Sequence, residues 1–261
     1  LYLCKTIIMD YKNILAEHKN DTCYITINRP KKLNALNTVT ISELSNAIKN
    51  ADDDSSIRCI ILTGSGKKAF VAGADIQEFA SFDVASGEHL ARKGQELLFD
   101  LLEKIGTPSI AAVNGFALGG GLELAMASHI RIASENARMG LPEVSLGLIP
   151  GYGGTQRLSS LVGKGKAIEM ITTGGMLTAE EAKDWGLVNY VCAQEEIISI
   201  AEKIATKIKN NSPMAIAKAI KSINASFIAG VDGFEVEKVE FGSCFGTPEF
   251  VEGTKAFMEK R

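Results

Sequence analysis

The segment NGFALGGGLELAMA, residues 114–127, decides the fold because it places the exit of a strand, a glycine turn and the start of a helix in succession. It follows the apolar run 110–113, which is typical of a buried strand, and the glycines lead directly into an apolar helical pattern. The first N–H groups of a helix have no partner within it and favour negative charge. The backbone N–H of Gly120 is therefore a candidate donor to an oxyanion.

Two glutamates lie where a carboxylate is costly. Glu123 enters the apolar helical pattern directly after the glycines, and Glu143 lies between apolar residues in GLPEV, residues 140–144. Carboxylates in such surroundings need a compensating partner or a function, so the pair is a candidate for acid/base catalysis. Each residue alone has a simpler alternative: Glu123 as a first-turn residue favoured by the helix dipole, and Glu143 as an ordinary turn residue.

The segment FVAGADIQE, residues 70–78, offers a second backbone donor. Asp75 and Glu78 have the spacing of a capping-box variant, which predicts a helix beginning just after Ala74. The small residues 72–74 would let a ligand approach the backbone closely. For this segment alone, a plain tight turn with a cap is the alternative.

Strand and helix patterns alternate through the first three quarters of the chain, which predicts an α/β fold. The expected strands are 23–27, 57–62, 110–113, 130–132 and 188–191, and the clearest expected helices between them are 38–50 and 95–105. From about Glu195 only helical patterns remain, at 195–209, 213–226, 232–244 and 248–260. Pro213 and Pro248 suit the first turns of two of these helices. No linker is apparent, so we expect one compact unit with a helical C-terminal region.

The composition excludes several functional classes. The net charge of −3 gives no reason to expect nucleic acid or an anionic membrane as partner. The five cysteines are scattered without metal-site or disulfide spacing, which favours reducing, cytoplasmic surroundings and no metal. No apolar run could span a bilayer. The chain begins with leucine and its first methionine is Met9, so we interpret residues 1–8 as an upstream or foreign extension.

Two other glycine-rich segments do not fit nucleotide-binding motifs. LTGSGKK, residues 62–68, lacks the first glycine and the final Ser or Thr of a phosphate-binding loop. GYGGTQ, residues 151–156, has Gln156 where a dinucleotide fingerprint requires the third glycine. We interpret the latter segment as a loop that turns sharply beside a ligand and enters a helix at Thr155.

Several ordered blocks of sequence together resemble the enoyl-CoA hydratase (crotonase) family, and within it the short-chain enoyl-CoA hydratases and 3-hydroxybutyryl-CoA dehydratases. The resemblance runs from about residue 13 to the C-terminus. The blocks that carry it are NRP (28–30), LNALN (33–37), AFVAGADI (69–76), AVNGFALGGGLEL (112–124), PEVSLGLIPG (142–151) and GTQRL (154–158).

The resemblance implies a crotonase-like spiral of repeated ββα units in residues 9–200 and a helical oligomerisation region in residues 201–261. Such chains form homo-trimers, which often pair into hexamers. It also implies a coenzyme A thioester as substrate, with the thioester carbonyl between the N–H groups of Ala74 and Gly120. Coenzyme A is then part of the substrate, and no separate cofactor is expected.

The two glutamates of the family's hydratases match Glu123 and Glu143, whereas many relatives with other activities lack one or both. The resemblance therefore implies reversible addition of water to a short trans-2-enoyl-CoA, giving a 3-hydroxyacyl-CoA, as in fatty acid β-oxidation. We expect Glu123 to activate the water and Glu143 to donate the α-proton. An enoyl-CoA isomerase, another acyl-CoA lyase or hydrolase, and a non-catalytic binding oligomer remain alternatives.

The resemblance also implies a set of lower-ranked substrate contacts. Ala72 and the stretch Ala74, Asp75, Ile76 and Gln77 are expected to lie along the acyl-CoA. Arg29 and Lys32 are expected near the CoA phosphates, and Lys260 from a neighbouring subunit is expected near the adenosine.

Overall fold

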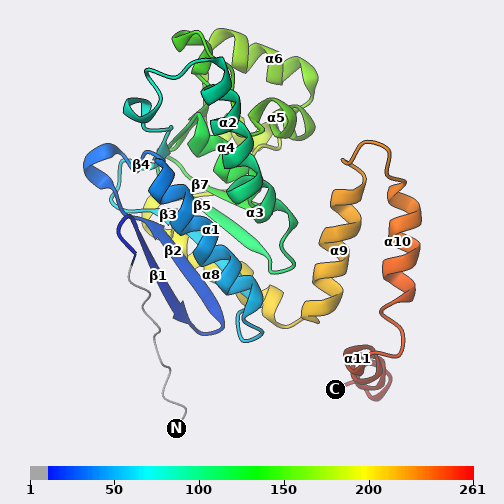
Figure 1. Ribbon diagram of the computed structural model, residues 1–261. Helices are drawn as coiled ribbons and strands as arrows, with labels where there is room; N and C mark the ends of the chain where they lie inside the picture. The colour runs from blue at the N-terminus through cyan, green and yellow to red at the C-terminus, as the bar shows by residue number, and fades with distance from the viewer. Residues whose placement is uncertain (1–10) are drawn as a thin grey trace.

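The computed structural model describes residues 11–261, so the predicted extension 1–8 lies outside the described part. The described strands form two sheets (Figure 1). The larger sheet has the order β1 (Ile14–Lys19), β2 (Thr22–Ile27), β3 (Cys59–Gly64), β5 (Ser109–Val113), β7 (Ile130–Ser134) and β10 (Tyr190–Cys192). The smaller sheet has the order β4 (Ala69–Ala72), β6 (Phe116–Leu118), β8 (Arg138–Gly140) and β9 (Met176–Thr178).

The chain visits the two sheets in turn. In each of the pairs β3 and β4, β5 and β6, and β7 and β8, the first strand joins the larger sheet and the second joins the smaller one. Strands β3, β5 and β7 are parallel neighbours in the larger sheet, and β4, β6 and β8 are parallel neighbours in the smaller one. Ala72 of β4 pairs with Leu118 of β6. The segments that leave β4 and β6 therefore emerge from the same end of the smaller sheet.

The helices of this part of the chain pack against the sheets and against one another. They are α1 (Thr38–Asp53), α2 (Val84–Gly94), α3 (Asp100–Lys104), α4 (Gly120–Ala127), α5 (Gly154–Val162), α6 (Lys164–Thr173), α7 (Ala179–Asp184) and α8 (Ile197–Lys209). Because side chains alternate along a strand, Ile60 and Leu62 enter the main core with α1 and α4, whereas Ile61 packs with Ala201 and Ala205 of α8.

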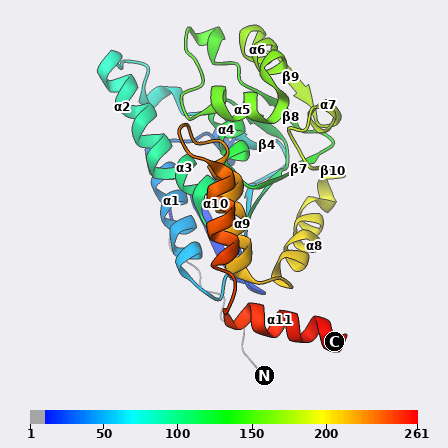
Figure 2. The ribbon, with the colours of Figure 1, turned by 90° about the vertical axis from the view of Figure 1, so that its right-hand side faces the viewer.

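The last three helices lie outside this core. α9 (Pro213–Ala225) and α10 (Gly233–Gly242) form a hairpin that stands beside it, and α11 (Pro248–Glu259) lies beyond the hairpin (Figures 1 and 2). Pro213 and Pro248 occupy first turns, as predicted. The predicted boundary at residue 200 falls inside α8, which packs on the sheet, so the break in packing comes after Lys209.

The expected order of an α/β core followed by helices is confirmed. The helix predicted over 95–105 is longer, because α2 begins at Val84 and continues through a π-helical turn, Gln95–Phe99, into α3. The short strands of the smaller sheet were not predicted from their patterns, which span too few residues to show a period. No helix within residues 11–261 is long and apolar enough to cross a membrane.

The predicted capping box at Asp75 and Glu78 is wrong. Only a single 3-10 turn, η2 (Ile76–Glu78), follows, and Asp75 makes no side-chain cap. The Asp75 carboxylate is instead paired with the Arg29 guanidinium at 2.9 Å, and Glu78 accepts the backbone N–H and the hydroxyl of Thr38 at 2.8 and 3.0 Å. The Asp75 carboxylate, which the local pattern predicted to cap a helix, therefore binds the guanidinium of Arg29 from another segment.

Candidate active site

Helix α4 brings a backbone donor and a carboxylate to the end of the smaller sheet. Gly119 makes the turn from β6 into α4 with φ +50° and ψ −126°, which favours glycine. A Cβ atom on Gly121 would collide with the carbonyl of Val71, so only glycine allows this close approach of the helix to β4. Every residue of α4 is buried. Gly120 and Glu123 are thus held on a dry, closely packed helix.

The segments that carry the predicted oxyanion donors run side by side. Gly73 and Gly119 directly follow the paired ends of β4 and β6, and a Cβ on Gly119 would lie 3.8 Å from the Cα of Gly73. Ala74 and Gly120 are the next residues along each segment. As the first residue of α4, Gly120 has an N–H without an acceptor inside the helix.

A bridge to Leu36 sets the direction of the Ala74 peptide. The N–H of Leu36 donates to the carbonyl of Gly73 at 2.9 Å, and the N–H of Asp75 donates to the carbonyl of Leu36 at 2.6 Å. The N–H of Ala74, between these two bonds, points away from Leu36 because successive peptides of an extended chain alternate in direction. No hydrogen bond from this N–H is formed to any residue from 11 to 261, so it is free for a ligand.

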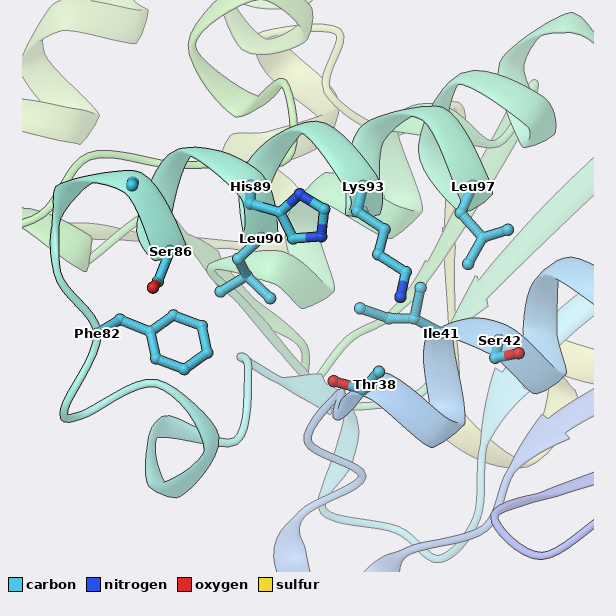
Figure 3. Close-up of a pocket in the computed structure, with 11 residues that line it drawn as sticks. Thr38, Ile41, Ser42, Phe82, Ser86, His89, Leu90, Lys93 and Leu97 are labelled. Carbon is cyan, nitrogen blue, oxygen red and sulfur yellow. The ribbon is translucent and has the colours of Figure 1, made fainter.

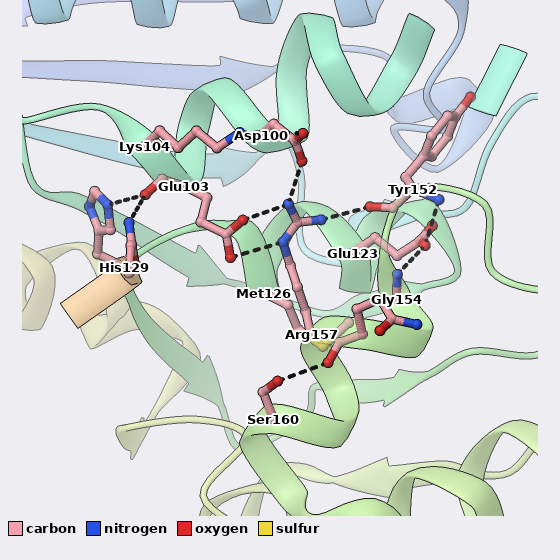
Figure 4. A network of polar contacts seen from close by, with 12 residues as sticks. Asp100, Glu103, Lys104, Glu123, Met126, His129, Tyr152, Gly154, Arg157 and Ser160 are labelled. Carbon is pink, nitrogen blue, oxygen red and sulfur yellow. Dashed lines mark hydrogen bonds and ion pairs between the residues drawn. The ribbon is translucent and has the colours of Figure 1, made fainter. Parts of the chain in front are cut away.

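Glu123 is almost completely buried, with 1% of its surface exposed. Its Oε1 atom accepts the backbone N–H groups of Tyr152 at 2.8 Å and of Gly154 at 2.7 Å (Figure 4). Oε2 accepts no bond from the described residues and remains for substrate or water. Burial raises the pKa of Glu123 to about 7, and the nearby charge of Glu143 adds to the rise against the opposing effect of the two N–H bonds.

Glu143 begins the 3-10 turn η4 (Glu143–Leu146) on the other side of the glycine turn. Its Oε1 atom would be 2.6 Å from a Cβ on Gly119, and its buried Oε2 atom has no hydrogen-bond partner within residues 11–261. Burial raises the pKa of this carboxyl as well. A buried polar atom without a partner needs an explanation, and a reacting group of a ligand supplies one.

The two carboxyl groups can act together as an acid and a base. Both have a raised pKa because both are removed from water, and the charge of Glu143 disfavours ionisation of Glu123. Near neutral pH the pair can therefore hold one proton between a proton acceptor and a proton donor. This arrangement can remove a proton at one point of a ligand and deliver one at another.

The predicted substrate contacts gather beside Ala74, with one exception. Arg29 pairs with Asp75, and the Nζ atom of Lys32 donates to Oε1 of Gln77 at 3.2 Å. Ile76 and Ala72 belong to the same segment as Ala74, and the Ile76 side chain is exposed. The Arg29 guanidinium is thus already committed to Asp75 and stabilises the segment that carries Ala74.

Lys260 lies apart from these residues within one chain. It is the C-cap of α11, which both views place away from the two sheets (Figures 1 and 2). The predicted contact of Lys260 with the adenosine therefore requires a neighbouring subunit, as the prediction stated.

A mainly apolar cavity of about 580 Å³ lies between α1 and α2 (Figure 3). Figure 3 shows Phe82, His89 and Leu90 on one side and Thr38 and Ile41 on the other. Neither glutamate lines the cavity. The cavity nevertheless lies near the site, because Gly94, which lines it, is packed against the ring of Tyr152.

The ring of Tyr152 lies between Gly94 of α2 and Gly120 of α4. A Cβ on Gly120 would lie 3.4 Å from Cδ2 and 3.6 Å from Cε2 of the ring, whereas a Cβ on Gly94, which lines the cavity, would collide with Cδ1 and Cε1. The ring is stacked on Phe99 with centroids 4.7 Å apart. Its two opposite edges therefore face Gly120 and Gly94.

The sequence did not reveal the residues that hold Glu123. The sequence predicts that the loop 151–156 turns beside a ligand, and the structure shows that the N–H groups of Tyr152 and Gly154 in this loop bind the Glu123 carboxylate. The glycines at 153 and 154 were the available signal: Gly153 has φ +90°, and a Cβ on Gly154 would lie 2.8 Å from Oε1 of Glu123. Within residues 11–261 no cluster of His, Cys, Asp and Glu could hold a metal ion.

Comparison with known proteins places this geometry in a family. The family model described as enoyl-CoA hydratase/isomerase matches residues 17–261. A short-chain-enoyl-CoA hydratase of Clostridium acetobutylicum is 45% identical over 254 residues, covering 97% of each chain. A crotonyl-CoA hydratase of Syntrophomonas wolfei is 43% identical with the same coverage. The crystal structure of an enoyl-CoA hydratase from Bacillus anthracis superposes with a TM-score of 0.89 at 38% identity, covering 96% of this chain and 97% of that one.

Proposed function

The chain belongs to the enoyl-CoA hydratase/isomerase family, and from this premise we propose that it is an enoyl-CoA hydratase. It adds water reversibly across the C2–C3 double bond of a short trans-2-enoyl-CoA to give a 3-hydroxyacyl-CoA. The predicted crotonase-like fold is confirmed by the structural neighbours. The observation that carries the activity is the pair of carboxyl groups at the glycine turn that leads to Gly120: Glu123 is buried, and Glu143 has a buried Oε2 atom without a partner among the described residues.

The reaction needs a site for negative charge on the thioester oxygen. Attack of water at the β-carbon moves electrons through the double bond and makes the thioester an enolate. The N–H groups of Ala74 and Gly120 are the donors for that oxygen, and Gly120 adds the N-terminal end of α4. Preorganised donors of this kind typically contribute about 10²–10³ in rate each.

Glu123 and Glu143 supply the proton transfers. In hydration, the water oxygen bonds to the β-carbon while ionised Glu123 accepts a proton from the water. Protonated Glu143 donates its proton to the α-carbon. In dehydration the roles reverse. The raised pKa of both groups supports one proton held by the pair near neutral pH, which leaves one acid and one base. The assignment of the base to Glu123 is part of the proposal.

Two carboxylates favour hydration over isomerisation. Moving a double bond along the chain needs a proton removed and returned, which one carboxylate can do. Water addition must both deprotonate the water and protonate the α-carbon, and the chain carries a group for each task. A short acyl chain is supported by the names of two relatives and by the Tyr152 ring beside Gly120.

The coenzyme A part of the substrate is assigned to the exposed side of the Ala74 segment. Lys32 and Gln77 are the groups we assign to the CoA phosphates and the adjoining chain, with Ile76 as an apolar contact. Arg29 acts beside them through its ion pair with Asp75.

We also propose that the chain works as a homo-trimer or a pair of trimers. The helices α9, α10 and α11 expose large apolar side chains, among them Phe234, Phe241 and Phe257 at 79, 67 and 84%. Exposed apolar patches of this kind mark interaction surfaces, and we assign this one to contact with neighbouring copies of the chain. A neighbouring copy would cover them and would bring Lys260 toward another chain's Ala74 segment.

The activity is tested by following the absorbance of the thioester-conjugated double bond of crotonyl-CoA. Loss of absorbance that depends on the protein, with 3-hydroxybutyryl-CoA as product, is the expected result. A series of longer trans-2-enoyl-CoAs covers the chain-length range. If no member of the series loses absorbance, the hydratase assignment is wrong.

A further inference from the structure

The loop that binds Glu123 does so through two peptide groups whose opposite sides are also bound. A trans peptide is planar, and its N–H and C=O point in opposite directions. The N–H of Tyr152 belongs to the same peptide as the carbonyl of Gly151, and the N–H of Gly154 to the same peptide as the carbonyl of Gly153. Fixing these two carbonyls therefore fixes the direction of both donors to Glu123.

Gln95 and Arg157 supply these anchors. Nε2 of Gln95 donates to the carbonyl of Gly151 at 2.7 Å, behind the N–H of Tyr152. The backbone N–H of Arg157 donates to the carbonyl of Gly153 at 2.9 Å, behind the N–H of Gly154. Nη1 of Arg157 donates to the intervening carbonyl of Tyr152, also at 2.9 Å. All three peptides between residues 151 and 154 are thus anchored.

The guanidinium of Arg157 is itself held by two carboxylates of α3. Nη2 lies 2.9 Å from Oδ1 of Asp100 and 2.8 Å from Oε2 of Glu103, and Nε donates to Oε1 of Glu103 at 3.2 Å (Figure 4). Only 9% of the Arg157 side chain is exposed. Its position is therefore fixed from both sides, by carboxylates on one and by the loop on the other.

Both anchors start from one helical stretch. Gln95 is the first residue of the π-helical turn Gln95–Phe99, and Asp100 and Glu103 follow it in α3. π-Helical turns are rare and occur often at functional sites. The Arg157 guanidinium is packed closely against the loop, because a Cβ on Gly153 would collide with it.

We propose that Gln95 and Arg157 are positioning residues of the hydratase reaction, because they anchor the peptide groups that hold the catalytic carboxylate of Glu123. The proposal rests on the proposed function. When the Gln95 anchor is lost, the peptide behind it can rotate, and Oε1 of Glu123 loses the N–H of Tyr152. Loss of the Arg157 side chain frees the intervening peptide between Tyr152 and Gly153, which joins the two donor peptides and no longer holds them in register. Oε2 is then no longer aimed at the attacking water.

The charges around Glu123 give the proposal a specific signature. Glu143 faces it from η4, Arg157 from α5 with Asp100 and Glu103 behind, and Tyr152 from the loop. The loop N–H bonds lower the pKa of Glu123, so weakening them raises it. Removal of Arg157 also removes a positive charge, which acts in the same direction. Removal of Gln95 changes no charge and tests the anchor alone.

The test compares Gln95→Met, Arg157→Met and Arg157→Lys with the wild type in crotonyl-CoA hydration. We expect kcat to fall about 10- to 100-fold in both Met variants with KM changed less than about twofold, since misplacement of a reacting group has effects of this size. The acidic limb of the kcat profile should move to higher pH by about half a unit or more. Lysine retains the charge beside Asp100 and Glu103, so Arg157→Lys should recover part of the loss.

Gln194→Met is the matched control. Nε2 of Gln194 donates to the carbonyls of Lys67 and Asn114, both at 2.7 Å, so this variant removes the same kind of bond elsewhere. It should lower the unfolding temperature without moving the pH profile. The proposal is overturned if Gln95→Met behaves like Gln194→Met, with an unchanged profile and kcat.

A readout without turnover separates this proposal from the proposed function. The carboxyl carbon of Glu123 can be titrated by ¹³C NMR in glutamate-labelled protein and assigned with Glu123→Gln. A higher titration midpoint in Gln95→Met than in the wild type supports the anchoring role even if the substrate class is wrong. An unchanged midpoint rejects it even if the wild type hydrates crotonyl-CoA.

Discussion

A Cβ atom on Gly119 would stand 2.6 Å from Oε1 of Glu143, so the turn before α4 and the second carboxylate occupy adjoining space. Gly119→Ala should therefore push Glu143 out of place, in addition to straining a backbone with φ +50°. We expect a loss in kcat of about 10²-fold or more, comparable with removal of one oxyanion donor. Gly163→Ala is the control: Gly163 has φ +79° and no atom within 4 Å of its Cβ position, so this substitution strains the backbone without displacing a neighbour. Equal losses in the two variants would contradict the role of the contact.

Glu123→Gln and Glu143→Gln should each reduce hydration by orders of magnitude. Glutamine keeps the shape of the side chain but can neither accept the water proton nor donate to the α-carbon. Binding of the product 3-hydroxybutyryl-CoA, measured by calorimetry, should change little. A single variant that retains more than about a tenth of the wild-type kcat would refute the assignment of that residue, since general acid/base catalysis contributes about 10²–10⁴.

The raised pKa of Glu123 makes this residue a source of instability at alkaline pH. In the unfolded chain the carboxyl ionises near its ordinary value of 4.5, whereas in the folded protein it keeps its proton up to about pH 7. The unfolded state therefore binds fewer protons between these values, and stability falls as pH rises through this window. Glu123→Gln should be more stable than the wild type by about 1–3 kcal/mol at pH 8, and by much less at pH 5. Urea denaturation at both pH values measures the difference, and a pH-independent difference would show that the pKa is not raised.

The ring of Tyr152 should limit the acyl chain. Tyr152→Ala would open space between Gly120 and Gly94 and leave the backbone N–H on Glu123. The ratio of kcat/KM for trans-2-decenoyl-CoA to that for crotonyl-CoA should rise about tenfold or more, because each buried CH₂ contributes about 0.8 kcal/mol. Tyr190→Ala, at an exposed position of β10, should leave the ratio unchanged. An unchanged ratio in Tyr152→Ala would mean that the chain runs elsewhere.

The exposed apolar side chains of the C-terminal helices should hold the oligomer together. The double variant Phe234→Ser, Phe241→Ser should sediment as smaller species than the wild type at micromolar concentration. Val84→Ser removes an equally exposed apolar side chain from α2, at 89% exposure, and should not change the sedimentation. A wild type that sediments as a monomer would refute the proposed trimer.

The core of the fold could be predicted because its elements are long and regular. The five strand patterns at 23–27 to 188–191 and the four C-terminal helices correspond to observed elements within a few residues. The smaller sheet could not be predicted, since its strands have three or four residues each. Its pairing depends on contacts between distant segments, such as Ala72 with Leu118.

Prediction of the site depended on what its residues share with a family. The glutamates and the glycine triplet had local signals, namely apolar surroundings and a helix start. Gln95 had no local signal, because the role proposed for it depends on a hydrogen bond to the carbonyl of Gly151, 56 positions away in the sequence. For Asp75 the local signal was misleading, since a capping pattern cannot reveal that Arg29 lies 2.9 Å from the carboxylate.

Gly120 and Glu123 lie on one buried helix, three residues apart. Residues so spaced are separated by slightly less than one helical turn, with a rise of about 4.5 Å, and this backbone spacing cannot be altered by movement of loops. With the roles proposed for Gly120 and Glu123, the helix fixes how far from the thioester oxygen a water molecule can be deprotonated. Sequence changes around Tyr152 or the cavity can alter which acyl tails fit, but the carbon that receives the hydroxyl group stays the same. Regiochemistry and chain-length selectivity can thus evolve independently in this protein.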